Sequence, residues 1–189
     1  MTTSNFVPDI VGDRLFFAKR RLQDLNRLEQ SYGGELGRTQ PRDRQQLIQE
    51  FFFHLVGAIE FLAQVVNDSK NLGIPMECVT PPEVCKKLGC NNPIGELLHK
   101  LYPATRSKPL PQDPYSEEGC HFRILVMRHW VCHYSHNPFY FRVGSIPPTS
   151  LFLDPRDSNL GGSQKPALDE MHHFWELVND KCQWILRQL

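Results

Sequence analysis

The segment from Phe51 to Val66 constrains the fold most, because apolar residues occupy nearly every side of the helix that it would form. A helix that is apolar all round is stable only when other helices surround it, so this segment predicts a central, buried helix. The whole helix is expected over about 43–71. His54 and Glu60 lie inside the apolar stretch and need polar partners there. We expect them to form a satisfied polar pair in the core; a supporting role beneath an active site is the alternative.

Two further segments carry apolar residues at the three- and four-residue spacing of an amphipathic helix. The first begins at Asp9 or Asp13 and runs to about residue 32, where a Gly-Gly pair stops it. The second covers about 167–188, and its unbroken alternation is typical of a seam in a helical bundle or a dimer. The predicted inward residues are Val11, Leu15, Ala18, Leu22, Leu25 and Leu28 in the first helix, and Leu168, Met171, Trp175, Val178, Cys182, Ile185 and Leu189 in the second.

Two short helices are indicated by their capping residues. A threonine, two prolines and a glutamate at 80–83 match a capping box, which predicts a helix over about 81–88. Asn92 and the proline after it begin a second short helix, which ends before Pro103. The stretch 103–115 contains four prolines and is expected to be a loop.

A fourth long helix is predicted from Ser116, which suits the N-cap and precedes two glutamates that complement the helix dipole. The helix continues to about residue 135, where an Asn-Pro pair ends it. Two apolar stretches follow, separated by glycine and prolines. They are compatible with a small β-hairpin at about 139–153.

Together these elements predict an all-α fold, an up-and-down bundle of four long helices with two short extra helices and the small hairpin. A chain of 189 residues fits one domain with a sizeable core. We therefore expect a single helical domain over 1–189, in which residues 1–8 form a loose tail.

Composition favours a soluble protein of the cytoplasm. The first twelve residues lack the basic start and the apolar run of a secretory signal. The apolar stretch of the central helix is short for a membrane span and carries His54, Glu60 and Gln64, so no membrane association is expected. The six cysteines are then expected to be free thiols, and the spacing of Cys85 and Cys90 matches no zinc-binding pattern. We expect no cofactor.

The stretch from Met127 to His136 is the first candidate for a functional site. Lys and Arg equal Asp and Glu in number, 21 against 21, so an anion-binding surface must be local. Residues 119–153 hold three arginines and four of the eight histidines but no acidic residue. Arginine presents a fork that matches phosphate oxygens, and histidine transfers protons at neutral pH. The stretch therefore suits contact with a phosphodiester.

Arg128 and His133 form an Arg-x4-His pattern at the end of an apolar helix, which resembles the motif of the HEPN superfamily of all-α domains. His129 takes the polar second position, where Asn is the more usual residue in the family, and Tyr134 follows the motif histidine. The predicted order of helices is also similar. The resemblance implies a metal-independent endoribonuclease with a toxin-like or defence role, or a non-catalytic relative that binds RNA or a protein. It also implies a homodimer, and it admits an antitoxin or a nucleotidyltransferase-like protein as a partner.

The chemistry of RNA assigns roles to these residues, because RNA carries its own nucleophile, the 2′-hydroxyl. Cleavage then needs a base, an acid and a group that stabilises negative charge at phosphorus. We assign proton transfer to His133, since histidine titrates near ~6.5, and charge stabilisation to Arg128. His129, Tyr134 and His136 are expected to orient these groups or to bind the RNA.

The spacing of the motif makes a second copy of the chain part of this hypothesis. Five residues along a helix turn about 140°, so Arg128 and His133 do not share a helical face. A two-fold axis would let the histidine of one copy meet the arginine of the other. We therefore expect a homodimer whose site is completed across the interface.

A metal site is the first alternative. His129, His133 and His136 lie at i, i+4 and i+7, on one face of a helix. Together with a histidine of the last helix, His172 or His173, or with Glu60, these side chains could hold a metal ion inside a bundle.

A non-catalytic interaction module is the second alternative. Phe139, Tyr140, Phe141 and Phe152 could form a surface that binds a protein or a second copy of the chain. These aromatic residues equally suit a hairpin folded over the core of the bundle itself. The residues of the motif would then only hold the end of their helix in place.

Overall fold

The computed structural model describes residues 9–31, 40–89, 91–103, 111, 113–133, 139–142, 149–152 and 165–189. For Ser31, Gln40, Pro41, Cys132, His133 and the segments 139–142 and 149–152 it describes the backbone. The predicted tail at 1–8 and the candidate residues Tyr134 and His136 lie outside the described residues.

Helices dominate the described residues, which confirms the all-α class. Each helix lies within a few residues of its predicted position. Four are long: α1 (Ile10–Ser31), α2 (Gln40–Ser69), α5 (Glu117–His133) and α6 (Ala167–Leu186). Two are short, α3 (Pro81–Leu88) and α4 (Pro93–Leu101), and a single 3₁₀ turn, η1 (Met76–Cys78), precedes them.

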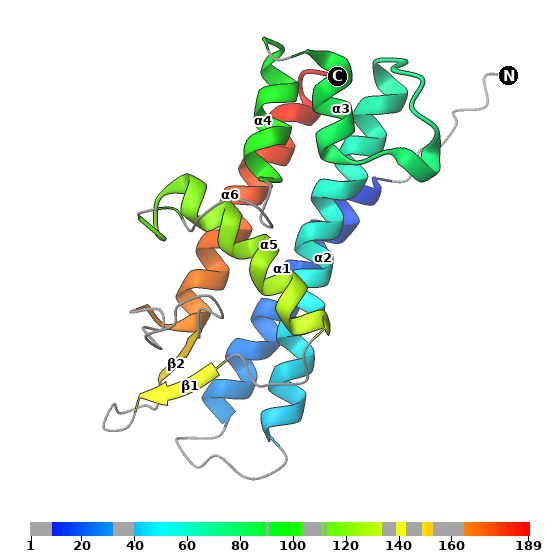
Figure 1. Cartoon of the computed structure of the whole chain (residues 1–189). Helices are drawn as coiled ribbons and strands as arrows, with labels where there is room; N and C mark the ends of the chain where they lie inside the picture. Colours follow the sequence, from blue (N-terminus) through cyan, green and yellow to red (C-terminus); the bar gives the residue numbers. More distant parts are fainter. Residues whose placement is uncertain are drawn as a thin grey trace, which may run out of the picture.

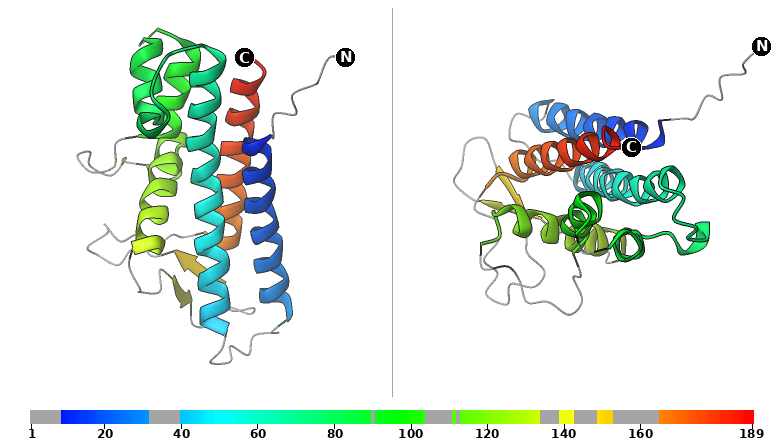
Figure 2. Two further views of the ribbon diagram at one scale, coloured as in Figure 1. Left: turned by 90° about the vertical axis from the view of Figure 1, so that its right-hand side faces the viewer. Right: turned by 90° about the horizontal axis from the view of Figure 1, so that it is seen from above.

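The helices α1 and α2 run antiparallel side by side and form the most extensive contact in the fold (Figure 1). α6 packs against both of them. α5 packs against α2 on the side away from α1 (Figure 2). α3 and α4 pack on each other beside the C-terminal end of α2 (Figure 1). α2 contacts each of the other helices, which confirms that it is central. The prediction that it is buried all round is wrong, because Phe53 is 50 % exposed on a face that none of these helices covers.

The main core lies where α1, α2 and α6 meet. Leu22 of α1, Phe52 and Leu62 of α2 and Val178 of α6 are completely buried. Each fully buried Leu or Phe side chain stabilises the fold by about 1.5–3 kcal/mol. One predicted inward position is wrong: Leu189 is 39 % exposed, because α6 ends at Leu186 and the helical periodicity ends with it.

The predicted caps of the short helices are confirmed. The Oγ1 atom of Thr80 accepts a hydrogen bond from the backbone N–H of Glu83, 3.4 Å away. The Oδ1 atom of Asn92 accepts from the backbone N–H of Ile94 at 2.9 Å. Gly89 ends α3 with a φ of +88°, a conformation that residues with a Cβ atom rarely adopt. These local interactions fix where α3 and α4 begin and end.

Two short strands follow α5 along the chain. β1 (Phe139–Arg142) and β2 (Thr149–Phe152) pair antiparallel, with Phe139 opposite Phe152 and Arg142 opposite Thr149. β2 lies against α6.

α2 is long and apolar enough, from Arg42 to Ser69, to cross a membrane by length and composition alone. The expectation that the protein does not associate with a membrane stays a prediction. About half of the most apolar part of α2 is buried inside the protein, as in the core helix of a folded domain. Leu55 and Ile59, for example, are completely covered by the neighbouring helices.

α5 is buried on all sides from Gly119 to Met127, and His121 lies in this segment with 1 % of its surface exposed. Neither ring nitrogen of His121 has a hydrogen-bond partner among the described residues. Burial lowers the pKa of His121 to about 4; Glu117 opposes this shift and Lys181 adds to it. His121 is therefore held neutral in the folded protein.

We expect the free energy of unfolding to fall as the pH is lowered from about 6.5 to about 4, the two pKa values of His121 in the unfolded and folded chain. In this window the unfolded chain binds a proton that the folded protein does not, so acid favours unfolding. The total loss is about 3 kcal/mol, at about 1.4 kcal/mol for each pKa unit. Urea unfolding across this pH range measures it.

His121→Leu is the matched control for this pH dependence. The variant should keep a nearly constant free energy of unfolding between the two pH values. A small remainder is expected from His54, because burial and the nearby Arg14 lower its pKa as well. A variant that loses stability with acid as steeply as the parent would show that His121 does not cause the effect.

Candidate functional site

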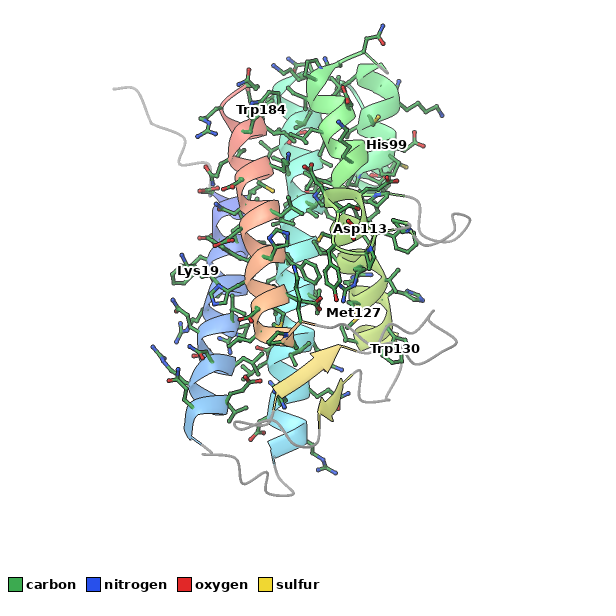
Figure 3. The ribbon with its side chains drawn as sticks, turned by 90° about the vertical axis from the view of Figure 1, so that its left-hand side faces the viewer. Lys19, His99, Asp113, Met127, Trp130 and Trp184 are labelled. Atoms are coloured by element: carbon green, nitrogen blue, oxygen red, sulfur yellow. The ribbon has the colours of Figure 1, made fainter. Side chains whose placement is uncertain are left out.

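The end of α5 that carries the motif is fixed to α2 by Gln49. The Nε2 atom of Gln49 donates a hydrogen bond to the backbone carbonyl of Val131, 2.7 Å away. The last carbonyls of a helix have no partner within the helix, so a side chain that binds one stabilises the end. Met127 lies on the inner, buried side of α5, whereas Trp130 lies at its outer edge (Figure 3).

We expect Gln49→Ala to loosen this end of α5. The variant loses the partly buried hydrogen bond to the carbonyl of Val131, which contributes about 1 kcal/mol to stability. Hydrogen exchange of the amides of residues 129–133 should become several-fold faster, while exchange at the N-terminal half of α5 stays unchanged. Equal protection of residues 129–133 in parent and variant would show that Gln49 does not hold the helix end.

Arg128 is half-buried on the flank of α5. Its Nε atom is enclosed and has no hydrogen-bond partner among the described residues. The positive charge lies close enough to Tyr102, the residue that ends α4, to influence its ionisation. A guanidinium at this position therefore retains at least one N–H group that the described part of the protein does not use.

Glu60 and Tyr102 extend the surroundings of Arg128. The hydroxyl of Tyr102 donates to Oε1 of Glu60, 3.3 Å away. Burial and the Glu60 carboxylate raise the pKa of Tyr102, and Arg128 opposes this shift. A tyrosine hydroxyl, a carboxylate and a guanidinium from three segments of the chain thus lie in one partly buried region.

The predicted core pair between His54 and Glu60 is wrong. The Nδ1 atom of His54 lies 3.2 Å from Nη1 of Arg14 in α1, whereas Glu60 contacts Tyr102. Six residues along a helix turn through about 600°, which leaves the two side chains about 120° apart. They therefore point to opposite flanks of α2. Each of the two side chains has its partner on another segment of the chain.

The structure describes some of the motif residues completely and others only in part. His129 is exposed, and α5 stays helical through His133. The continuous helix maintains the separation of about 140° between the positions of Arg128 and His133. The side chain of His133, like Tyr134 and His136, lies outside what the structure describes.

The charge of the segment 119–153 is lower than its sequence indicates, because Arg123 is neutralised by a residue of α6. Its Nη1 and Nη2 atoms donate to the two carboxylate oxygens of Glu170 at 2.8 and 2.9 Å. The side chains are only 6 % and 2 % exposed. The segment 119–153 contains no acidic residue, but the carboxylate that compensates Arg123 lies 47 residues further along the chain, at Glu170. Arg123 is a structural residue of the core and is not part of an anion-binding surface.

The described side chains contain no group of three His, Cys, Asp or Glu residues that could hold a metal ion. His172 and His173, considered above as further ligands, are exposed on α6. Glu60 accepts the hydrogen bond of Tyr102. The side chains of the two other predicted ligands, His133 and His136, lie outside what the structure describes.

Sequence reasoning did not identify Gln49 or Tyr102 as neighbours of the motif. A glutamine in the polar first turns of a helix and a tyrosine before a proline carry no signal that links them to a segment far along the chain. No protein-family model matches this sequence, and no curated protein or solved structure shows a significant similarity to it.

Proposed function

We propose that this protein is a metal-independent endoribonuclease of the HEPN type, built as an up-and-down bundle of four long helices in a single domain. His133 transfers protons, and Arg128 stabilises the negative charge that develops at phosphorus. His129, Tyr134 and His136 orient these groups or bind the RNA. Action in the cytoplasm, as a toxin-like or defence protein held in check by an antitoxin, belongs to the same proposal.

The observation that carries the proposal is the environment of Arg128. Arg128 is half-buried, so its side chain is partly open to solvent, although its Nε atom is enclosed and has no hydrogen-bond partner among the described residues. A phosphate oxygen is a suitable acceptor, because the guanidinium fork binds phosphate through two N–H groups. Tyr102 and Glu60 border the same region and are suited to hold the arginine in place or to contact the ribose.

The geometry of α5 supports a site shared between two copies of the chain. Since the helix continues unbroken to His133, one copy presents Arg128 and position 133 on different faces. A two-fold axis near this helix end would bring the arginine of one copy toward the histidine of the other. A homodimer is therefore part of the proposed function.

A non-catalytic interaction module is the second candidate function. The observation that favours it is the exposure of large aromatic residues on α1 and α2, since Phe17 is 40 % and Phe53 is 50 % exposed. Clustered exposed aromatic residues are typical of surfaces that bind another protein. The two functions are compatible when the bound protein is a second copy.

The test is RNA cleavage in the presence of EDTA. The parent protein should cleave single-stranded or structured RNA, leave a DNA strand of the same sequence intact and produce 2′,3′-cyclic phosphate ends, because the 2′-hydroxyl is the nucleophile. The Arg128→Ala/His133→Ala double variant should be inactive. Equal inactivity of parent and double variant on both kinds of RNA would favour the interaction module. Cleavage that EDTA abolishes would favour a metal site at the histidines.

A further inference from the structure

An exposed aromatic cluster lies where α1 and α2 face solvent together. It consists of Phe17 and Arg14 of α1 and Phe53, His54 and Phe61 of α2. Phe17 and Phe53 expose 40 % and 50 % of their surfaces. Ordinary surfaces of soluble domains carry scattered apolar residues, whereas contiguous apolar groups mark binding surfaces. The cluster is therefore a candidate binding surface.

The side chains of the cluster hold one another in a fixed arrangement. The guanidinium of Arg14 lies over the rings of Phe53 and Phe61, 5.1 Å from each centroid. The ring of His54 stacks on Phe17 at 5.3 Å and meets the edge of Phe53 at 5.4 Å. Such a preorganised surface loses little side-chain entropy when it binds, which is a property of efficient interfaces.

Gly57 lies within the cluster. It lies one helical turn from both Phe53 and Phe61, and the Arg14 side chain passes over it. A Cβ atom at this position would be 3.7 Å from Cδ of Arg14. This distance is an ordinary van der Waals contact, so an alanine would also fit beneath the arginine.

The cluster belongs to the face of α2 that turns away from the core. Leu55, Ile59 and Leu62 are completely buried on the opposite face of the helix. Figure 2 (left) shows α1 and α5 on either side of α2, and among the described residues no helix or strand crosses the outer face between them. This face is also continuous with the candidate site, because Gln49, one turn before Phe53, binds the end of α5.

The charges around the cluster indicate the class of partner. Arg21 pairs with Asp24 at 3.4 Å and with Glu50 at 3.3 Å, so the border of the cluster is close to neutral and contains both signs. A polyanion such as RNA needs an excess of positive charge, which this border lacks. A surface with both signs and exposed aromatic rings is suited to pair with a copy of itself about a two-fold axis.

The size of the face also fits a second copy. α1 is about 33 Å long, at about 1.5 Å for each residue, and two helices side by side are about 20 Å wide. The face therefore offers on the order of 700 Å² for each copy. Stable interfaces of standard size bury about 600–1,000 Å² from each partner.

We propose that the outer face of α1 and α2, centred on Phe17 and Phe53, is the surface through which two copies of this chain associate. This inference rests on the proposed function in one respect, the requirement that the site be completed by a second copy. It adds the surface, and it places the α5 end of each copy next to the interface, through the contact between Gln49 and Val131.

Sedimentation of the full-length protein at micromolar concentration tests the surface without any RNA. The parent should be a dimer, and Phe53→Glu on α2 or Phe17→Glu on α1 should raise the dimer dissociation constant about 30-fold or more, as loss of a central aromatic contact does. Met76→Glu is the control, because Met76 is 74 % exposed on η1 and lies outside the cluster. Circular dichroism checks that each variant is folded.

A monomeric parent, or folded Phe53→Glu and Phe17→Glu variants that remain as dimeric as Met76→Glu, would overturn the proposed surface. The outcome is separate from that of the nuclease proposal. A parent that dimerises through this face but leaves RNA intact would refute the nuclease and support the surface. A parent that cleaves RNA as a monomer would refute the surface and the shared site together.

Discussion

Replacement of His133 by alanine is expected to slow RNA cleavage at neutral pH by about 10²–10⁴-fold, because the variant loses the group that transfers protons. Arg128→Ala should lose about 10²–10³-fold, which is typical when one group that stabilises developing charge is removed. Arg128→Lys should lie between Arg128→Ala and the parent, because lysine keeps the charge but not the two-pronged donor geometry. Single-turnover cleavage of one defined RNA measures all three.

The control for these substitutions is His99→Ala. His99 is an exposed histidine of α4, so its replacement changes the histidine content without touching the motif (Figure 3). It should cleave RNA at the parent rate. If His133→Ala retained the parent rate in the same assay, His133 would have no role in proton transfer.

Replacement of Glu170 by leucine is expected to lower the free energy of unfolding by about 3–5 kcal/mol. The variant leaves the guanidinium of Arg123, which is 6 % exposed, without the carboxylate that now accepts two of its hydrogen bonds. Phe174 and Tyr115, whose rings lie near this guanidinium at 5.6 and 5.5 Å, cannot neutralise its charge. Urea unfolding followed by circular dichroism measures the loss.

The double variant Arg123→Met/Glu170→Leu separates the two contributions to this loss. A buried ion pair replaced by apolar residues of similar volume is often neutral or stabilising, because neither charge then has to be desolvated. We therefore expect the double variant to regain most of the stability that Glu170→Leu loses. A double variant as unstable as the single one would show that packing at position 170, and not the unpaired charge, sets the cost.

The helices could be predicted from the sequence because their signals are local. Apolar residues at three- and four-residue spacing identify α1 and α6, and the caps at Thr80 and Asn92 identify the short helices. The prediction for Leu189 is wrong because the same spacing continues past the end of α6, where no residue signals a stop.

The polar contacts of the interior could not be predicted, because each joins segments far apart in the chain. The partners of His54, Glu60 and Arg123 lie 40, 42 and 47 residues away from them. Which of several polar residues meet depends on the rotation and crossing of the helices, and periodicity does not specify these. The assumption that nearby polar residues of α2 pair with each other was wrong for this reason.

The candidate site could be predicted only as a motif. The pattern of Arg128 and His133 is visible in the sequence, and the helix through both positions is confirmed. The contributions of Gln49 and Tyr102 come from the packing of α5 against α2 and the end of α4. An exposed aromatic face is equally hard to predict, since Phe53 follows two phenylalanines that are completely buried.

The most direct measurement is the rate of RNA cleavage by a mixture of two inactive variants, Arg128→Ala and His133→Ala, refolded together so that their subunits exchange. Half of the dimers then contain one chain of each kind, and one of their two shared sites has both Arg128 and His133. We expect about a quarter of the parent rate in EDTA. A mixture as inactive as each variant alone, beside a parent that cleaves RNA, would contradict a site shared between two copies.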